Sequence, residues 1–403
     1  MSSMPWRPAL VALICAALLA GCSSGDDDAG AGEDRSPTSS TTETTAAPTE
    51  TDAEAGEQES VTPGAEWATA DAEEMGFDPA ALDAVAAEAE AAGSNCLLVT
   101  RRGRIVAEWY WNEGRPDRPQ EVFSATKSFS STLVGIAQDR GALSVEEPAA
   151  TYLTEWAGGP SAAVTVEDLL SNDSGREWSL VQDYVELIRA PDRDEFALGL
   201  GQEHDPGEVW AYNNAAIQTL DVVLERATGQ PTAQFAQEHL LAPIGMADSS
   251  MTVDPAGNTL TFMGLQSTCR DMARFGHLFL QEGEWDGRQV VSSEWVQRAT
   301  RPSQELSAAY GYLWWLNRPG RLVEPTIATG GPAEAGGVEE GQMVDGAPED
   351  MFWARGMGGQ MVQVDPGSQT VAVRLGPSAV PEGAEAFSDE ALASIMTEAL
   401  VAP

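Results

Sequence analysis

The 403-residue sequence predicts an α/β (α+β) fold in which a single β-sheet is built from both ends of the folded chain. Five segments have the apolar, β-branched or aromatic composition of strands, at 96–100, 104–110, 350–355, 360–365 and 370–375. Between the second and third of these, from about 145 to 290, the patterns are mainly helical and loop-like. Strands at both ends with helices between them predict one sheet and an inserted helical region.

The expected elements follow one another with recognisable boundaries. Residues 79–92 have a helical pattern, and the Arg-Arg-Gly turn at 101–103 makes a hairpin of the first two strands. A helix over 129–140 is closed by a glycine. The Asp-Pro-Gly-Ser turn at 365–368 joins the last two strands. Residues 388–401 contain no proline and predict a closing helix.

The first 22 residues have the features of an export signal. Arg7 gives a short positive region, and the apolar run at 9–20 has 12 residues, too few to span a bilayer. The run ends in Leu19-Ala20-Gly21-Cys22, which resembles the lipobox of bacterial lipoproteins. Cys22 is therefore the expected lipidation site, with the chain anchored in the cell envelope on the outer face of a bacterial membrane. The alternative is an ordinary cleaved signal.

Residues 23–66 have the composition of a disordered tether rich in Ser, Thr and acidic residues. They contain twelve acidic residues, Arg35 as their one basic residue, and Val61 as their one branched aliphatic or aromatic residue. Such a segment cannot bury enough apolar surface to offset the entropy of the chain. The folded domain is therefore expected over 67–403.

Charge and composition exclude several classes of function. The net charge of −41 would repel phosphates, so nucleic acid is not an expected partner. The three histidines, at 204, 239 and 277, show no zinc-binding spacing, so no metal site or other cofactor is expected. The Gly-x-Ser-x-Gly elbow of α/β-hydrolases is missing from the sequence.

Two cysteines, Cys96 and Cys269, remain in the expected folded domain. In an oxidising compartment an even pair can form a disulfide. Two separate buried thiols are the alternative.

Lys127 is the only lysine of the chain, and it follows Ser124 by three positions in the segment Phe-Ser-Ala-Thr-Lys. Residues at this spacing share one face of a helix. A desolvated lysine can lose its proton and act as a base, which arginine cannot do. The pair therefore predicts an activated serine nucleophile.

Five further segments follow in a characteristic order, at 165–175, 206–214, 268–276, 310–315 and 356–360. Together with the Ser-x-x-Lys segment, they resemble the motifs of the serine beta-lactamase and penicillin-binding-protein superfamily, in its class C and esterase-like branch. Within it, the chain most resembles serine hydrolases of the 6-aminohexanoate-dimer hydrolase type. The resemblance covers about 67–400.

This resemblance implies a beta-lactamase/transpeptidase-like fold, with an antiparallel sheet flanked by helices, a mostly helical subdomain, and the site between them. It implies that Ser124 is the nucleophile, Lys127 its base, and Tyr212 a second acid/base group. Asn214 would hold Lys127 or the substrate amide by hydrogen bonds.

The resemblance also implies an oxyanion hole of two backbone N–H groups, one from Ser124. The other follows the glycine of the third family motif. Aligning that glycine with Gly356 makes Met357 the donor, whereas a shifted register makes Gln360 the donor. In both registers the lysine of that motif is missing, which argues against beta-lactam and D-alanyl-D-alanine substrates. Arg355 would replace it only if its side chain pointed inward.

The expected function is therefore a membrane-tethered, extracytoplasmic serine hydrolase that cleaves a small ester or amide through an acyl-enzyme on Ser124. The alternatives are a penicillin-binding-type D-alanyl peptidase or beta-lactamase, and a catalytically silent ligand-binding lipoprotein. The Gly-rich, acidic stretch at 329–350 contains no basic residue and is expected to border the cleft, which would favour neutral or cationic substrates.

Overall fold

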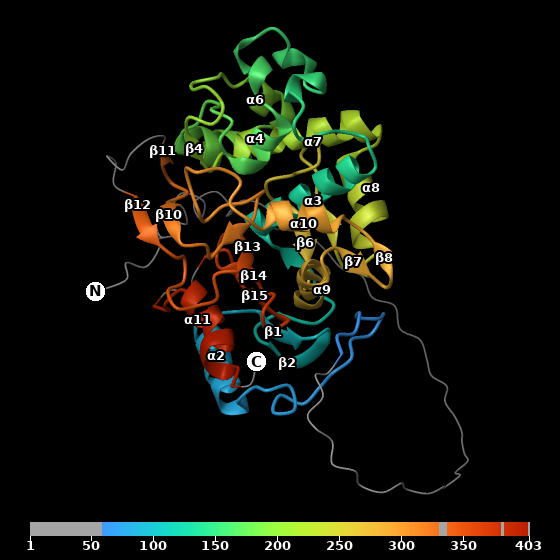
Figure 1. Ribbon diagram of the computed structural model, residues 1–403, viewed down its shortest axis with the longest axis vertical. Helices are drawn as coiled ribbons and strands as arrows, with labels where there is room; N and C mark the ends of the chain where they lie inside the picture. Colours follow the sequence, from blue (N-terminus) through green and yellow to red (C-terminus); the bar gives the residue numbers. More distant parts are fainter. Residues whose placement is uncertain (1–58, 330–336, 380–382, 402–403) are drawn as a thin grey trace, which may run out of the picture.

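The computed structural model describes residues 59–329, 337–379 and 383–401 (Figure 1). The expected export signal at 1–22, the lipidation site Cys22 and the tether up to residue 58 lie outside the described residues. Within those described ranges, no helix is both long and apolar enough to cross a membrane.

The centre of the fold is a six-stranded antiparallel sheet in the order β2-β1-β15-β14-β13-β9. Its strands are β1 (Cys96–Arg101), β2 (Arg104–Tyr110), β9 (Trp315–Leu316), β13 (Phe352–Gly356), β14 (Gln360–Asp365) and β15 (Thr370–Leu375). β1 pairs with β15, so that Cys96 lies opposite Leu375 and Arg101 lies opposite Thr370. The prediction of one sheet built from both ends of the chain is confirmed, and β9 is a strand that the sequence did not indicate.

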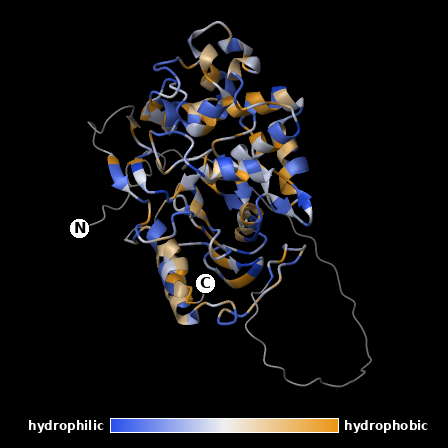
Figure 2. Cartoon of the chain, in the orientation of Figure 1, coloured by the Kyte–Doolittle hydropathy of each residue, from blue (hydrophilic) through white to orange (hydrophobic). Residues whose placement is uncertain are grey.

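Helices cover both faces of this sheet. On one face, Gly276 of α9 (Cys269–Leu280) lies so close that a Cβ there would be 2.6 Å from a methyl carbon of Val371. On the other face, Gln363 of β14 donates hydrogen bonds to Leu392 O and to Met396 Sδ. All residues of β1, β14 and β15 are therefore buried, as expected for strands covered on both sides. Figure 2 shows orange and blue residues mixed along the helices, which bury one side and expose the other.

The helices on the second face come from the two ends of the folded chain. They are α2 (Pro79–Ala91) and α11 (Asp389–Ser394), which continues into a π-helical turn, Ile395–Ala399. Asp78 and Ser388 cap these helices by accepting backbone N–H groups. The predicted closing helix at 388–401 is thus shorter and ends in a wider turn.

The helical region lies on the opposite side of the molecule from α2 and α11 (Figure 1, green to yellow). It contains α4 (Val166–Ser171), α5 (Leu187–Arg189), α6 (Arg193–Gly199), α7 (Asn214–Thr228) and α8 (Thr232–Ala236). α3 (Thr126–Asp139) packs against both α7 and β13 and so connects the two parts. The predicted helical insertion at about 145–290 contains α4 to α8. α9 also lies within that range, but it packs against the sheet.

Short elements complete the fold. The remaining helix is α10 (Ser293–Ala299), and the short strands form pairs or a triplet: β3 (Gln120–Glu121), β5 (Ser250–Met251) and β6 (Leu265–Ser267); β4 (Trp210–Ala211) and β11 (Ala328–Thr329); β7 (Glu284–Trp285) and β8 (Arg288–Gln289); β10 (Gly320–Val323) and β12 (Val338–Gly341). The pairing of β11 with β4 matters for the site, because β4 directly precedes Tyr212.

Residues 59–66, which the sequence assigned to the tether, contact the folded domain. Arg274 of α9 donates to the carbonyl oxygens of Pro63 and Gly64, and Val61 N donates to Arg102 O. Residues 59–66 are therefore bound to the domain although they have few apolar side chains. Their contacts are made by backbone carbonyl oxygens, which the amino-acid composition of the segment cannot predict.

Cys96 and Cys269 form a disulfide, with 6.5 Å between their Cα atoms. The bond joins the first residue of β1 to the first residue of α9. The alternative of two separate thiols is wrong.

Candidate active site

Ser124 lies in a 3₁₀ turn, Phe123–Ala125, that runs directly into α3. The preceding residue, Phe123, has a φ of 49°, which is a costly conformation for a residue with a side chain. The helix predicted at 129–140 in fact begins at Thr126, so Lys127 lies in its first turn. The turn and the helix together direct Ser124 and Lys127 to the same side.

Glu121 holds this turn in place. Its carboxylate accepts the N–H of Phe123 at 2.9 Å and that of Gly264 at 2.8 Å, and it accepts the side-chain amide of Gln266 at 2.7 Å. Burial raises the pKa of Glu121, whereas these three donors lower it. Glu121 therefore ties the turn of the serine to the loop at 262–266.

Lys127 is buried, with 1% of its surface exposed. Its Nζ atom lies 2.8 Å from Ser124 Oγ and 2.8 Å from Phe262 O. Burial lowers the pKa of Lys127 to about 7, and the negative charge of Asp183 acts in the opposite direction. A substantial fraction of the amine is therefore neutral near neutral pH and able to accept the proton of Ser124.

Tyr212 lies on the other side of the pair. Its ring centroid lies 4.7 Å from Lys127 Nζ, and the side chain of Ser124 is close enough to act on its hydroxyl. Burial raises the pKa of Tyr212, while the side chain of Ser124 lowers it. The tyrosine is thus a neutral phenol that can both donate and accept a hydrogen bond.

Aromatic side chains surround Tyr212 and fix its ring. The centroids of Trp315 and Tyr310 lie 5.6 and 6.0 Å from it, and that of Trp210 lies 6.5 Å from it. Edge-to-face and tilted contacts at these distances are favourable for aromatic rings. The structure therefore brings together Ser124, Lys127 and Tyr212, the three residues predicted to be catalytic.

Asn214 directly follows the Tyr212–Asn213 segment, and its predicted role toward Lys127 or a substrate amide stays a prediction. Its side-chain Nδ2 donates to Asp183 at 2.7 Å, and the amide oxygen has no hydrogen-bond partner among the described residues. Asp183 was not found from the sequence, because it is one of 63 acidic residues and belongs to no motif. It lies in a π-helical turn, Gln182–Glu186, that packs against the start of α7.

Gly356 lies against the turn of the serine. A Cβ at this position would be 2.1 Å from Val122 O and 3.2 Å from Ala125 N, so only glycine lets β13 approach this closely. The side-chain amide of Gln360 donates hydrogen bonds to Met357 O and Gly376 O at the end of the sheet. Because Gly356 contacts the turn of the serine, the register that aligns it with the motif glycine and makes Met357 the second oxyanion donor stays the preferred prediction.

A model of the beta-lactamase family matches residues 82–395. The chain belongs to the beta-lactamase family. It is 28% identical over 224 residues to a 6-aminohexanoate-dimer hydrolase of Paenarthrobacter ureafaciens, covering 51% of this chain and 56% of that protein. It is 32% identical over 157 residues to esterase EstB of Burkholderia gladioli, covering 34% of this chain and 40% of the esterase.

A solved structure of a family VIII carboxylesterase has a TM-score of 0.60 and 17% identity, covering 79% of this chain and 96% of that one. This likeness shows the fold. The aligned part of the chain spans about half the length of the two curated relatives. Family membership confirms the resemblance seen in the sequence, and the relatives of the chain include a hydrolase, an esterase and a penicillin-binding protein.

The chain departs from the family motif beside Gly356. In the register that aligns Gly356 with the motif glycine, Ala354, which is fully buried, stands at the position of the motif lysine. The neighbouring Arg355 donates to Asp389 at 2.6 Å and lies 5.4 Å from the ring of Trp315. Its charge is therefore balanced by a carboxylate of α11, which limits its ability to replace the missing lysine.

The acidic stretch at 329–350 begins beside the candidate site. β11 pairs with β4, so that Ala328 lies opposite Ala211, one residue before Tyr212. Farther along, Glu339 and Glu340 lie on β12. Residues 330–336, including Glu334, lie outside the described residues.

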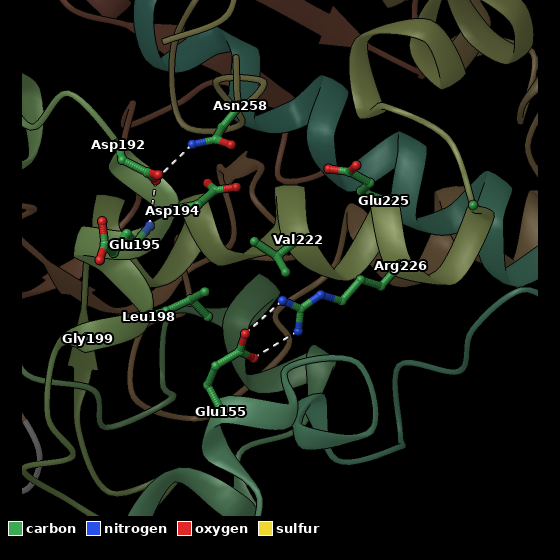
Figure 3. Close-up of a pocket in the computed structure, with 11 residues that line it drawn as sticks. Glu155, Asp192, Asp194, Glu195, Leu198, Gly199, Val222, Glu225, Arg226 and Asn258 are labelled. Atoms are coloured by element: carbon green, nitrogen blue, oxygen red, sulfur yellow. Dashed lines mark hydrogen bonds and ion pairs between the residues drawn. The ribbon is translucent and has the colours of Figure 1, made fainter. Parts of the chain in front are cut away.

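A second concave region, with a cavity of about 830 Å³, lies along the C-terminal half of α7 (Figure 3). Its acidic side chains are Glu155, Asp192, Asp194, Glu195 and Glu225, and Glu155 forms an ion pair with Arg226 at 2.7 Å. Tyr212 and Asn214 lie at the opposite end of α7. Over the ranges that the structure describes, no group of three or more His, Cys, Asp or Glu residues could hold a metal ion.

Proposed function

We propose that this protein is an extracytoplasmic serine hydrolase that cleaves a small ester or amide through an acyl-enzyme on Ser124. The observation that carries the proposal is the 2.8 Å contact between Ser124 Oγ and the buried amine of Lys127. A buried lysine amine this close to a serine hydroxyl is an arrangement that activates the serine.

In the acylation step, Ser124 Oγ attacks the carbonyl carbon of the substrate and passes its proton to the neutral amine of Lys127. The carbonyl oxygen becomes an oxyanion, which the backbone N–H groups of Ser124 and Met357 would stabilise. As the bond to the leaving group breaks, Tyr212 gives its proton to the leaving oxygen or nitrogen and regains one from Lys127. The products of this step are the Ser124 ester and a neutral alcohol or amine.

In the deacylation step, a water molecule attacks the Ser124 ester and gives a proton to the Tyr212–Lys127 pair. The ester bond breaks, the proton returns to Ser124 Oγ, and the carboxylic acid product leaves. Tyr212 suits this exchange because its hydroxyl is close enough to Ser124 for the two to interact and its ring contacts Lys127.

The proposal includes a place in the cell envelope. The export signal at 1–22 and the lipobox-like segment ending at Cys22 support a lipid anchor on the outer face of the membrane, and 23–58 would act as the tether. Globomycin treatment, which blocks lipoprotein signal cleavage, together with a Cys22→Ala variant, tests this part. A lipid anchor predicts membrane fractionation of the wild type and release of the variant.

The main alternative is a D-alanyl peptidase or beta-lactamase. Such substrates carry a carboxylate, and here the motif lysine is replaced by a buried alanine while Arg355 is paired with Asp389. The structure therefore favours an ester or amide without that carboxylate. A silent ligand-binding lipoprotein is less well supported, because Ser124, Lys127 and Tyr212 are in mutual contact.

Two assays separate these functions. A fluorophosphonate probe should label the wild type and leave Ser124→Ala unlabelled, whereas an unlabelled wild type would support the silent lipoprotein. Hydrolysis of short-chain p-nitrophenyl esters is then compared with binding of a fluorescent penicillin. Ester turnover without penicillin labelling supports the proposal, and stable penicillin labelling with little ester turnover supports the peptidase.

A further inference from the structure

Asp183 is a buried carboxylate next to the catalytic group, with only 1% of its surface exposed. Its oxygens accept three N–H donors from the first two residues of α7. These are the backbone N of Asn214 at 3.0 Å, the side-chain Nδ2 of Asn214 at 2.7 Å, and the backbone N of Ala215 at 2.9 Å. A buried carboxylate needs such partners, and the free N–H groups of a helix start provide them.

The donors belong to the segment that carries Tyr212. Asn213, between Tyr212 and α7, caps the helix by accepting the N–H of Ala216 at 2.8 Å. Asp183 binds the next two residues from the side. Trp178 Nε1 also donates to Tyr212 O at 3.1 Å, so several contacts position the Tyr212 segment, and Asp183 is the charged one among them.

Asp183 also determines the orientation of the Asn214 side-chain amide, that is, which end of the amide faces the carboxylate. A carboxylate accepts and cannot donate, so it selects the NH₂ end of the amide. The amide oxygen is left as an acceptor, with no partner in the described part of the chain.

Asp183 is moreover the negative charge that acts on Lys127. The other groups around the amine are uncharged: Ser124 Oγ, the carbonyl and ring of Phe262, and the ring of Tyr212. Arg355 acts on Tyr212 from β13 and is paired with Asp389. Burial favours the neutral amine, and Asp183 opposes it, so the balance sets the basicity of Lys127.

We propose that Asp183 is a positioning residue of this active site: it holds the Tyr212–Asn214 segment and supplies the buried negative charge that keeps Lys127 basic enough to accept a proton from Ser124. The proposal rests on the proposed hydrolase function. It goes beyond that function by assigning a role to a residue that belongs to none of the family-like motifs. Its two parts, the hydrogen bonds and the charge, can be separated by substitution.

The test uses the fact that Lys127 is the only lysine. Protein labelled with ¹³Cε-lysine gives one side-chain signal, and its shift against pH reports the titration of Lys127 without any assay of activity. Asp183→Asn keeps the shape and removes the charge, so the midpoint should move to lower pH. Asp183→Ser is a second uncharged variant, and Asp183→Glu, which keeps the charge, should stay close to the wild type.

Asp221→Asn is the matched control. Asp221 is equally buried, lies on α7, whose first two residues Asp183 binds, and accepts the backbone N–H of Thr259 at 2.8 Å, but it is not among the charges that act on Lys127. This variant should lose thermal stability without moving the Lys127 midpoint. An unchanged midpoint in both Asp183→Asn and Asp183→Ser would overturn the proposal, even if both lost stability.

Kinetics provide the second readout. In Asp183→Asn, kcat/KM for a p-nitrophenyl ester should fall on the order of tenfold to a hundredfold, as expected for misplaced catalytic groups. Its rise with pH should begin at lower pH than in the wild type, and Asp183→Glu should recover part of the rate. Loss of rate with an unshifted pH profile would show a purely structural role and would also overturn the proposal. Because the NMR titration needs no turnover, failure of the hydrolase function would be seen separately, as absent fluorophosphonate labelling of the wild type.

Discussion

The Nζ atom of Lys127 lies 2.8 Å from Ser124 Oγ, and a second contact of 2.8 Å holds it to Phe262 O. The carbonyl of Phe262 comes from a loop that Glu121 ties to the turn of the serine. The lysine is thus positioned by two segments that are far apart in sequence: the turn that carries Ser124 and the segment that carries Phe262. This arrangement leads to the following predictions.

The first prediction concerns the lysine. Lys127→Arg should reduce ester hydrolysis nearly as much as Lys127→Ala, because arginine keeps the charge but cannot accept a proton near neutral pH. Steady-state kinetics of both variants measure this. Retention of most activity by Lys127→Arg would mean that the lysine is an electrostatic anchor and not a base.

The second prediction concerns the nucleophile. Ser124→Ala should abolish hydrolysis while the fold remains, and mass spectrometry of wild type quenched with substrate should find the acyl group on Ser124. Ser131→Ala is the matched control, because Ser131 is a buried serine of α3, the helix that follows Ser124, and its hydroxyl has no hydrogen-bond partner among the described residues. Acylation of another serine, with Ser124 unmodified, would contradict the assignment.

The third prediction is the pH dependence of the reaction. Burial lowers the pKa of Lys127 to about 7, and the neutral amine is the active form. The value of kcat/KM for a neutral ester should therefore rise about tenfold per pH unit below pH 7 and level off above it. A profile that is flat from pH 5 to 8 would exclude Lys127 as the base.

The fourth prediction concerns substrate charge. Neutral or cationic esters should be turned over faster than anionic ones of equal size, because Arg355 is balanced by Asp389 and the acidic stretch at 329–350 begins beside the site. The preference should shrink at high salt. Equal or faster turnover of the anionic ester at low salt would refute this.

The Asp389→Asn variant tests the cause of that preference. Releasing the charge of Arg355 should raise the relative kcat/KM for the anionic ester on the order of fivefold, the equivalent of ~1 kcal/mol for one charge pair in a wet site. Asp192→Asn, in the distant cavity, is the control and should leave the ratio unchanged.

The fifth prediction concerns stability and pH. Burial raises the pKa of Asp173 to about 8, with further contributions from Asp168 and Glu167. Since the unfolded value is about 3.9, this group stabilises the fold most at low pH, and that stabilisation is lost as pH rises from about 4 to 8. Asp173→Asn, which resembles the protonated acid, should therefore raise the melting temperature at pH 9 and change it little at pH 4. A shift that is the same at both pH values would contradict this account.

The sequence by itself determined the sheet built from both ends and the pairing of Ser124 with Lys127, because strand composition and helical spacing are local properties. Order along the chain was sufficient to indicate Tyr212 and Gly356 through the family motifs. In contrast, only the tertiary structure identified Asp183 and Glu121 and paired Arg355 with Asp389. In a chain with 63 acidic residues, a single carboxylate carries no local signal. Its role depends on burial and on which N–H groups or charges it meets, and both are decided when distant segments pack together.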